Sequence, residues 1–362
     1  MRSRINDEIE VSQASPEQVV VAARLAHEVY RDTAIGAAFR TPEAVLHRWR
    51  WIMDGNPVGS RTPAPAWVAT RSGAIVGHFA LIPVVVAAGR REFAAAWGRD
   101  FFVVRSARGG GVGPRLVATV ARSVGHVIVA GLNPAARNAY ERADFRDRGR
   151  IPFYLKVLRP AEVASTVRGG GRPIVRALAG IAAAMGRSRP SSTHRKARIL
   201  DSFDETFDRW WAQVEPRLAC VIRRTSATMN WRYVGHPSHQ YRLLTIERAG
   251  EPQGYAVVRV GVSRGLPAGF IVELLARPGD GETSADLIEA AERTLRHGSD
   301  DLAFIRANAF GSGIGAAMLG RGFVPAPSPF RWMVAFPRDG RATWDPRCTL
   351  SLNSGDSDLD FI

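Results

Sequence analysis

Hydrophobic and polar positions divide the first 150 residues into helix-like segments followed by strand-like ones. Residues 15–30 begin with Ser-Pro-Glu and carry apolar residues at helical spacing, and residues 42–53 repeat that pattern. Three apolar, β-branched runs follow, separated by short glycine-containing turns, and they predict an antiparallel meander at residues 67–70, 75–86 and 92–104. A glycine-rich turn, a helix to Val124 and a strand at 127–132 come next. This half of the chain is therefore predicted to be an α/β unit.

The same order of elements begins again near Asp201. The pattern predicts helices at 204–214 and 228–233, strands at 241–246, 254–260 and 269–276, a helix at 284–296, a strand at 302–307, a helix at 311–321 and a strand at 331–336. The second half repeats the order of elements without repeating the sequence. The predicted fold class is α/β (α+β), with two modules that each contain a mixed, mostly antiparallel sheet flanked by helices.

Composition places the domain boundaries. We expect a first domain at 1–158, a basic Gly/Pro/Ser-rich linker at 159–200, a second domain at 201–340 and a C-terminal tail at 341–362, solvated from residue 354 onward. Within the linker, the pattern predicts a short apolar helix at 174–185, between arginines. Residues 168–189 therefore have two interpretations, a peripheral contact with an acidic membrane surface or a helix packed between domains. Alternating aspartates in the tail lack the glycine and glutamate of a calcium loop.

The charge and the cysteines indicate which partners and which cellular compartment to expect. The formal charge of +15 is almost all arginine, since Lys156 and Lys196 are the only lysines. A GC-rich bacterial genome accounts for that bias as readily as selection for a basic surface does. We therefore expect no nucleic-acid partner. Cys220 and Cys348 match no metal spacing and indicate a reduced, cytoplasmic setting, and no metal is expected. The polar first ten residues predict no signal peptide, no apolar run is long enough to span a bilayer, and nothing indicates an oligomeric state.

The stretch FFVVRSARGGGVGPRL, residues 101–116, carries the clearest chemistry. Glycines between a strand and a helix let backbone N–H groups point at one anionic ligand, and the helix N-terminus adds positive potential. A Walker loop is excluded because the stretch ends Gly113-Pro114-Arg115, without Lys-Ser/Thr. A dinucleotide fingerprint lacks its third glycine and its acidic residue. A pyrophosphate loop and an Arg/Gly-rich surface turn remain as the two interpretations.

Two motifs resemble those of the GNAT acetyltransferases. Arg108, Gly111 and Gly113 match the acyl-CoA motif Arg-x-x-Gly-x-Gly. The second motif, Asn-x-x-Ala-x-x-x-Tyr-x-x-x-Gly-Phe, is matched by Asn133, Ala136, Tyr140 and Phe145, with Asp144 in place of the glycine. The resemblance covers roughly residues 65–158. The departure at Asp144 affects the local helix end rather than the chemistry.

The resemblance implies an acyl-CoA-dependent N-acyltransferase that moves an acetyl group from acetyl-CoA to an amine. It implies these acetyl-CoA contacts: Phe102, Val103, Val104, Arg108, Gly109, Gly110, Gly111, Val112, Gly113, Asn133 and Ala136. The backbone near Val103 and Val104 would polarise the thioester. Tyr140 matches the family's general acid, and Asp100 or His78 is the candidate base. Each of these three also has a structural interpretation, as a packed tyrosine, a turn cap and a buried histidine.

The second module resembles a degenerate copy. Asp280 and Glu282 stand where a pyrophosphate would bind, and Met318 stands where the tyrosine would be. Its use would be to wall off a small-molecule or sugar-like acceptor through Trp231, Arg232 and Tyr233, although each of these also suits core packing. Two other functions stay open, a peptidoglycan-bridge-type aminoacyl transferase and a non-catalytic acyl-CoA-binding scaffold.

Overall fold

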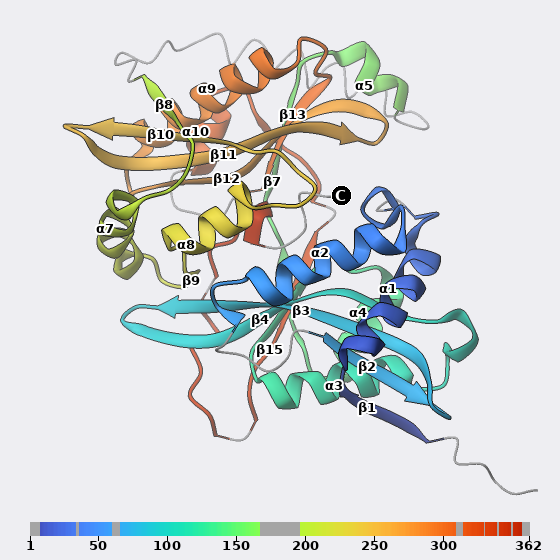
Figure 1. Cartoon of the computed structure of the whole chain (residues 1–362). Helices are drawn as coiled ribbons and strands as arrows, with labels where there is room; N and C mark the ends of the chain where they lie inside the picture. Colours follow the sequence, from blue (N-terminus) through green and yellow to red (C-terminus); the bar gives the residue numbers. More distant parts are fainter. Residues whose placement is uncertain are drawn as a thin grey trace, which may run out of the picture. The chain divides into compact units, whose positions relative to one another are not determined.

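A computed structural model describes residues 8–33, 36–59, 66–166, 196–308, 314–328, 330–338, 340–348 and 350–356. The described residues form two compact units (Figure 1). Unit 1 contains the chain up to Arg150 and returns for Pro329–Cys348, and unit 2 contains Ile151–Ser328 and Thr349–Asp356. Each unit is a mixed sheet flanked by helices, which confirms the predicted fold class.

Along its main series of strands, the sheet of unit 1 is antiparallel except at one pair. Its order is β1 (Ile9–Gln13), β2 (Ala66–Arg71), β3 (Ala74–Ala88), β4 (Arg91–Val103), β5 (Val127–Ala130), β15 (Arg331–Ala335) and β6 (Arg146–Arg150). Only β4 and β5 are parallel in this series, because helix α3 (Val112–Val124) carries the chain between them. The predicted meander of three strands is thus β2, β3 and β4.

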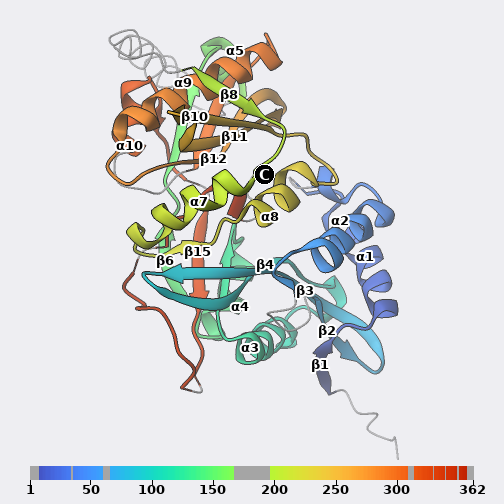
Figure 2. The same cartoon turned by 60° about the vertical axis from the view of Figure 1, so that its left-hand side comes forward.

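Helices cover both faces of this sheet (Figures 1 and 2). On one face α3 and α4 (Pro134–Arg142) bury a core against Trp67 and Ala69 of β2. On the other, α1 (Pro16–Tyr30), η1 (Gly36–Phe39) and α2 (Pro42–Gly55) pack against Ala66 and Val68. Alternate residues of one strand thus enter opposite cores, as the period of two requires. Both α1 and α2 begin at the proline that follows a side-chain cap, Ser15 or Thr41.

Unit 2 repeats the pattern of unit 1 strand for strand. Its sheet runs β8 (Ala197–Leu200), β10 (Arg242–Arg248), β11 (Glu251–Ser263), β12 (Leu266–Ala276), β13 (Phe304–Asn308), β7 (Phe153–Val157) and β14 (Val324–Pro325), and only β12 and β13 are parallel. Helices α9 (Gly281–Gly298) and α10 (Ile314–Gly320) bury the main core on one face. The remaining elements of unit 2 are α5 (Pro160–Thr166), α7 (Glu205–Val214), η4 (Glu215–Arg217), β9 (Val221–Ile222), α8 (Ser226–Met229), the π-helical turn η5 (Asn230–Val234) and η6 (Ser354–Asp356).

The two units exchange one equivalent strand. Strand β15, from the late part of the chain, lies between β5 and β6 in unit 1, and β7, from the early part, lies between β13 and β14 in unit 2. We expected a boundary at residue 158 and a strand at 331–336 in the second module. The ladders instead place 153–157 in unit 2 and 331–335 in unit 1.

The expected linker and tail differ in part from the structure. Helix α5 and strand β8 lie inside the stretch 159–200, whereas the predicted apolar helix at 174–185, and all of 168–189, lie outside the described residues. The expectation of a solvated tail from residue 354 is wrong at its described end, because Ser354 and Asp356 are buried. No helix among the described residues is long and apolar enough to cross a bilayer.

Candidate functional site

Strand β4 extends beyond its last pair with strand β5. The parallel pairs stop at Gly98 and Val129, whereas β4 continues to Val103. At this point β4 also bulges against β3, since Asp100 and Phe101 together face the single residue Phe79, and Asp100 has a φ of 49°. Val104 N–H bonds the Val76 carbonyl, so by strand alternation the peptide groups of Val103 face the opposite, open side. The open edge of β4 is where an extended ligand can add.

The glycine loop begins where this edge ends. Gly109 and Gly111 have φ values of 84° and 76°, which side-chain-bearing residues rarely adopt. Gly111 is the N-cap of α3 and offers no side chain to the first turn, so the amides there stay available to a ligand. Arg108 folds back and donates from Nε to the Val103 carbonyl at 3.1 Å. The loop, its arginine and the open strand edge are thus adjacent.

A cation that sequence reasoning missed lies beside the loop. A Cβ on Gly110 would stand 2.9 Å from a terminal nitrogen of Arg71, the last residue of β2. The expected rim arginine, Arg108, therefore has a second guanidinium close by. No motif marks Arg71, because a cross-sheet neighbour of the loop is fixed only by the fold.

Tyr140 lies on the same side of β4 as the loop. It is buried on α4, and its ring centroid is 5.4 Å from that of Phe101 and 5.9 Å from that of Phe79. A Cβ on Gly113 would lie 3.3 Å from the Phe101 ring, so the start of α3 packs on the same aromatic group. The structure thus brings Tyr140, Phe101 and the glycine loop together.

Asn133 and Ala136, both expected to contact acetyl-CoA, form a hydrogen bond with each other. Asn133 is the N-cap of α4 and its Oδ1 accepts from Ala136 N–H at 2.8 Å. That bond orients the helix that carries Tyr140. Phe102, also expected there, turns its side chain into the opposite core among α1 and α2.

Asp100, a candidate base, is held by two hydrogen bonds and a further ion pair in the core facing α2. Its Oδ2 accepts from Arg48 Nη2 at 3.0 Å and Trp49 Nε1 at 2.7 Å, and lies 3.3 Å from Arg99 Nε. Burial alone would raise the pKa of Asp100, but Arg99, Arg48 and the Trp49 bond lower it to about 2. A carboxylate held this firmly in its charged form is a weak proton acceptor.

His78, the second candidate base, is fully buried beside Asp100. Its Nδ1 lies 3.2 Å from the Asp100 carbonyl, and its ring stacks on Trp49 with centroids 4.3 Å apart. Burial lowers the pKa of His78 to about 4, against the raising effect of the Asp100 carbonyl and carboxylate. His78 is therefore neutral at physiological pH. Both candidate bases lie on the α2 side of β4, whereas Tyr140 lies on the α3 side.

One sequence signal pointed to this cluster. Val45, Arg48, Trp49 and Ile52 form the buried stripe of α2. A charged residue inside an apolar helical stripe indicates a buried ion pair. Tyr30, which donates to the Phe101 carbonyl at 2.6 Å, gave no such signal because its partner is remote in sequence.

In unit 2, the position equivalent to the glycine loop is already occupied. Asp280 is the N-cap of α9, and its carboxylate accepts from Thr283 N–H at 2.8 Å and from the Thr283 hydroxyl at 2.5 Å. A helix N-terminus that carries its own carboxylate repels a phosphate. Met318, in place of the tyrosine, is buried in the apolar core.

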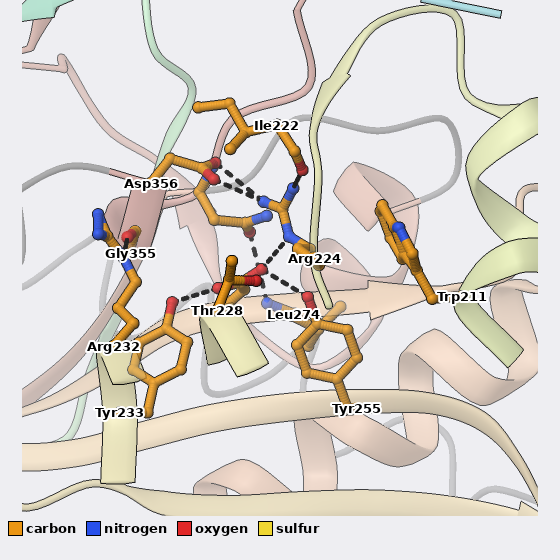
Figure 3. Close-up of polar contacts among 12 residues, drawn as sticks. Trp211, Ile222, Arg224, Thr228, Arg232, Tyr233, Tyr255, Leu274, Gly355 and Asp356 are labelled. Carbon is orange, nitrogen blue, oxygen red and sulfur yellow. Dashed lines mark hydrogen bonds and ion pairs between the residues drawn. The ribbon is translucent and has the colours of Figure 1, made fainter. Parts of the chain in front are cut away.

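Two of the three expected acceptor contacts, Arg232 and Tyr233, lie at a buried ionic cluster of unit 2 (Figure 3). The Tyr233 hydroxyl donates to Glu273, and Arg232 donates to the Gly355 carbonyl with its guanidinium 5.7 Å from the Trp231 ring centroid. Tyr233 is buried, so its hydroxyl serves the fold of unit 2 in this structure. The acceptor role of these residues stays a prediction.

The cluster fixes the end of the described chain. Arg224 donates to Glu273 and, at 2.8 and 2.9 Å, to both carboxylate oxygens of Asp356 (Figure 3). Tyr255 donates to Glu273 as well. Burial raises the pKa of Asp356 to about 6 although Arg224 opposes it, whereas Arg224 and the two tyrosines hold the pKa of Glu273 below its ordinary value despite burial. Nothing in the sequence paired these groups, because they come from four separate segments.

Comparisons with known proteins agree with this geometry. Residues 26–145, which hold α2, the meander, the glycine loop and Tyr140, match the Acetyltransferase (GNAT) family. Unit 1 is a GNAT-family domain. This match in unit 1 supports an acyltransferase. No curated protein matches the chain in sequence.

Solved structures extend the similarity in fold to both units. A GCN5-related N-acetyltransferase from Anabaena variabilis is 12% identical with a TM-score of 0.59, covering 90% of this chain and 72% of that one. An N-myristoyltransferase of Saccharomyces cerevisiae with bound myristoyl-CoA is 11% identical with a TM-score of 0.58, covering 94% and 86%. A GCN5-related N-acetyltransferase from Kribbella flavida is 15% identical with a TM-score of 0.54, covering 92% and 72%. The similarity in fold to these structures therefore extends over 90–94% of this chain.

The described parts of the two units contain no cluster of side chains that could hold a metal ion. Across those residues, no group of three or more His, Cys, Asp or Glu side chains is placed to hold an ion.

Proposed function

We propose that unit 1 transfers an acetyl group from acetyl-CoA to the amine of a small-molecule or sugar-like acceptor. The observation that supports this best is the open edge of β4 meeting the uncapped start of α3 at Arg108. That junction offers amides for a pyrophosphate and a strand edge for the pantetheine chain. Arg71, beside Gly110, adds a second positive charge toward the phosphates.

The transfer needs few groups. The neutral amine attacks the thioester carbon, and the developing oxyanion is stabilised by a backbone N–H on the open side of β4, with Val103 the nearest candidate. The C–S bond then breaks, the thiolate takes a proton from the Tyr140 hydroxyl, the attacking nitrogen loses its proton to solvent, and solvent returns a proton to the Tyr140 phenolate. Asp100 and His78 act in this proposal as positioning residues, because they hold the bulge from the other face of β4.

A short acyl group suits the packing around the bulge. Phe79, Phe102 and Tyr140 are all nearly fully buried on the two faces of β4 next to Val103. Rings packed at this density leave little volume for a long alkyl chain without displacement. This favours acetyl over the myristoyl group that the similar yeast structure binds. The thiols of Cys220 and Cys348, which form no disulfide, support a reducing, cytoplasmic setting.

The test is thiol release from acetyl-CoA, and from a long-chain acyl-CoA, in the presence of a panel of amino sugars and aminoglycosides. Tyr140→Phe should lower turnover by about 10- to 1000-fold, the range for losing a positioned acid, with acetyl-CoA affinity unchanged. Tyr154→Phe, in β7 of unit 2, is the matched control and should keep full activity.

Each other outcome rejects part of the proposal. Binding of acetyl-CoA without thiol release for any amine indicates a scaffold. Turnover of the long-chain donor alone rejects acetyl. Transfer from aminoacyl-tRNA, without any binding of CoA, indicates a bridge-type aminoacyl transferase. Full activity of Tyr140→Phe means that the proton reaches sulfur by another route.

A further inference from the structure

Unit 2 contains a cavity of about 730 Å³ at the edge of its sheet, beyond the last residue of β8. Its walls come from the start of β10, from Val258–Val260 of β11, from the last turn of α9 and from the segment that follows η5. The side chains that carry its chemistry are Tyr233, His236, His239, Tyr241, Arg242 and Arg259. Cavities of this size hold small molecules.

One wall is a fixed group of aromatic rings. His236 and His239 stack with centroids 5.0 Å apart and an interplanar angle of 14°, and Tyr241 meets both rings edge-on. The Tyr233 ring supports Tyr241 from behind at 5.1 Å. Because the Tyr233 hydroxyl donates to Glu273, this wall is joined to the buried ionic cluster of unit 2.

The backbone sets the hydrogen-bonding character of His236. Its Nδ1 accepts from the N–H groups of Ser238 and His239 at 3.1 and 3.0 Å. A neutral imidazole that accepts at Nδ1 carries its proton on Nε2. His236 is therefore a donor at Nε2, as is the Tyr241 hydroxyl.

Two arginines make the lining cationic. Arg259 is 7% exposed, and its guanidinium lies 3.9 Å from the Phe270 ring centroid, which holds it in place. Arg242 is exposed at the rim, on the strand next to β11. Asp201 is the single carboxylate residue among those that line this cavity. Hydrogen-bond donors and positive charge thus predominate.

We propose that this cavity binds a small anionic molecule by its phosphate or carboxylate oxygens, through His236, Tyr241 and Arg242, with Arg259 supplying the fixed charge. The cavity is not a remnant of an acyl-CoA site. The loop equivalent to the donor loop precedes Gly281 at the first turn of α9, whereas the cavity touches Thr294–Gly298 at the last turn. The proposal is therefore independent of the acyl-transfer activity of unit 1.

Calorimetric titration of the full chain with inorganic phosphate, and separately with acetate, tests the proposal. Arg242→Gln and His236→Asn should each weaken binding of the preferred ion about tenfold, the effect of losing one charge-assisted contact or one buried donor. The asparagine keeps an acceptor for the two backbone N–H groups while it removes Nε2–H. Arg248→Gln, an exposed arginine at the far end of the same strand, is the matched control and should bind as the wild type does.

A second control separates this cavity from the glycine loop, which also attracts phosphate. Arg108→Gln should leave the component that Arg242→Gln weakens unchanged. The proposal is overturned if neither ion binds with a dissociation constant below about 10 mM. It is also overturned if Arg242→Gln and His236→Asn, with circular dichroism like that of the wild type, bind both ions unchanged.

Discussion

Replacing the Asp100 carboxylate by an amide should destabilise unit 1 strongly. Asp100→Asn keeps the shape of the side chain and tolerates the φ of 49°, so it removes only the charge. Arg48 and Arg99, whose side chains are 2% exposed, would then face an amide in place of an anion. Both guanidinium groups would remain buried with their main counter-charge gone.

The magnitude follows from two estimates. A pKa of about 2 in place of 3.8 means that the folded state prefers the carboxylate over its protonated form by about 2 kcal/mol. Removing one partner of a buried ion pair costs about 3–5 kcal/mol. We therefore expect a loss of about 2–5 kcal/mol in the free energy of unfolding, or roughly 4–20 °C in the melting temperature of a unit of this size.

Differential scanning calorimetry measures this loss directly. Asp54→Asn, an exposed aspartate near the end of α2, is the matched control and should melt as the wild type does. If Asp100→Asn melts with the control, the carboxylate does not neutralise the two arginines and our account of the bulge is wrong. If instead it melts normally but loses turnover only, Asp100 is the base.

Two further predictions concern protons and the end of the chain. Because burial lowers the pKa of His78 from 6.5 to about 4, the unfolded state binds more protons between these values, so the stability of unit 1 should fall by roughly 3 kcal/mol as the pH drops from 6.5 to 4. Thermal melts across that range should show at least this fall, because burial also lowers the pKa of His126 in unit 1 to about 4. His78→Gln should remove the part that His78 contributes, and equal slopes for both proteins would contradict the assignment. Asp356→Ala should cost unit 2 roughly 3 kcal/mol, since Arg224 would keep only Glu273 as its anion. Hydrogen exchange should show the loss in unit 2 and leave the amides of β4 in unit 1 protected, and uniform loosening of both units would refute it.

Local patterns were sufficient for the elements and for the glycine loop. Apolar spacing predicted α1, α2 and the meander, because each of these buries one face against a neighbouring element. The loop was readable because left-handed φ values at Gly109 and Gly111 leave a sequence signature.

The pairing of segments far apart in the sequence could not be predicted from local patterns. Strands β7 and β15 are both apolar strands that fit either sheet by local pattern, so only the ladders show that they are exchanged. A fragment ending near residue 158 would therefore lack β15 and leave β5 and β6 without the strand between them. For the same reason the partners of Asp100, and the pairing of Arg224 with Asp356, had to be seen in the fold.

The central claim is that the glycine loop of unit 1 binds acetyl-CoA, and calorimetric titration with acetyl-CoA tests it most directly. The wild type should bind one acetyl-CoA per chain, because Asp280 occupies the equivalent helix start in unit 2. Gly111→Asp should abolish that binding by placing a negative side chain at the start of α3. Gly73→Asp, at a φ of 79° with equally open surroundings in the β2–β3 turn, should carry the same backbone strain and bind normally. Two sites per chain, or normal binding by Gly111→Asp, would contradict the account.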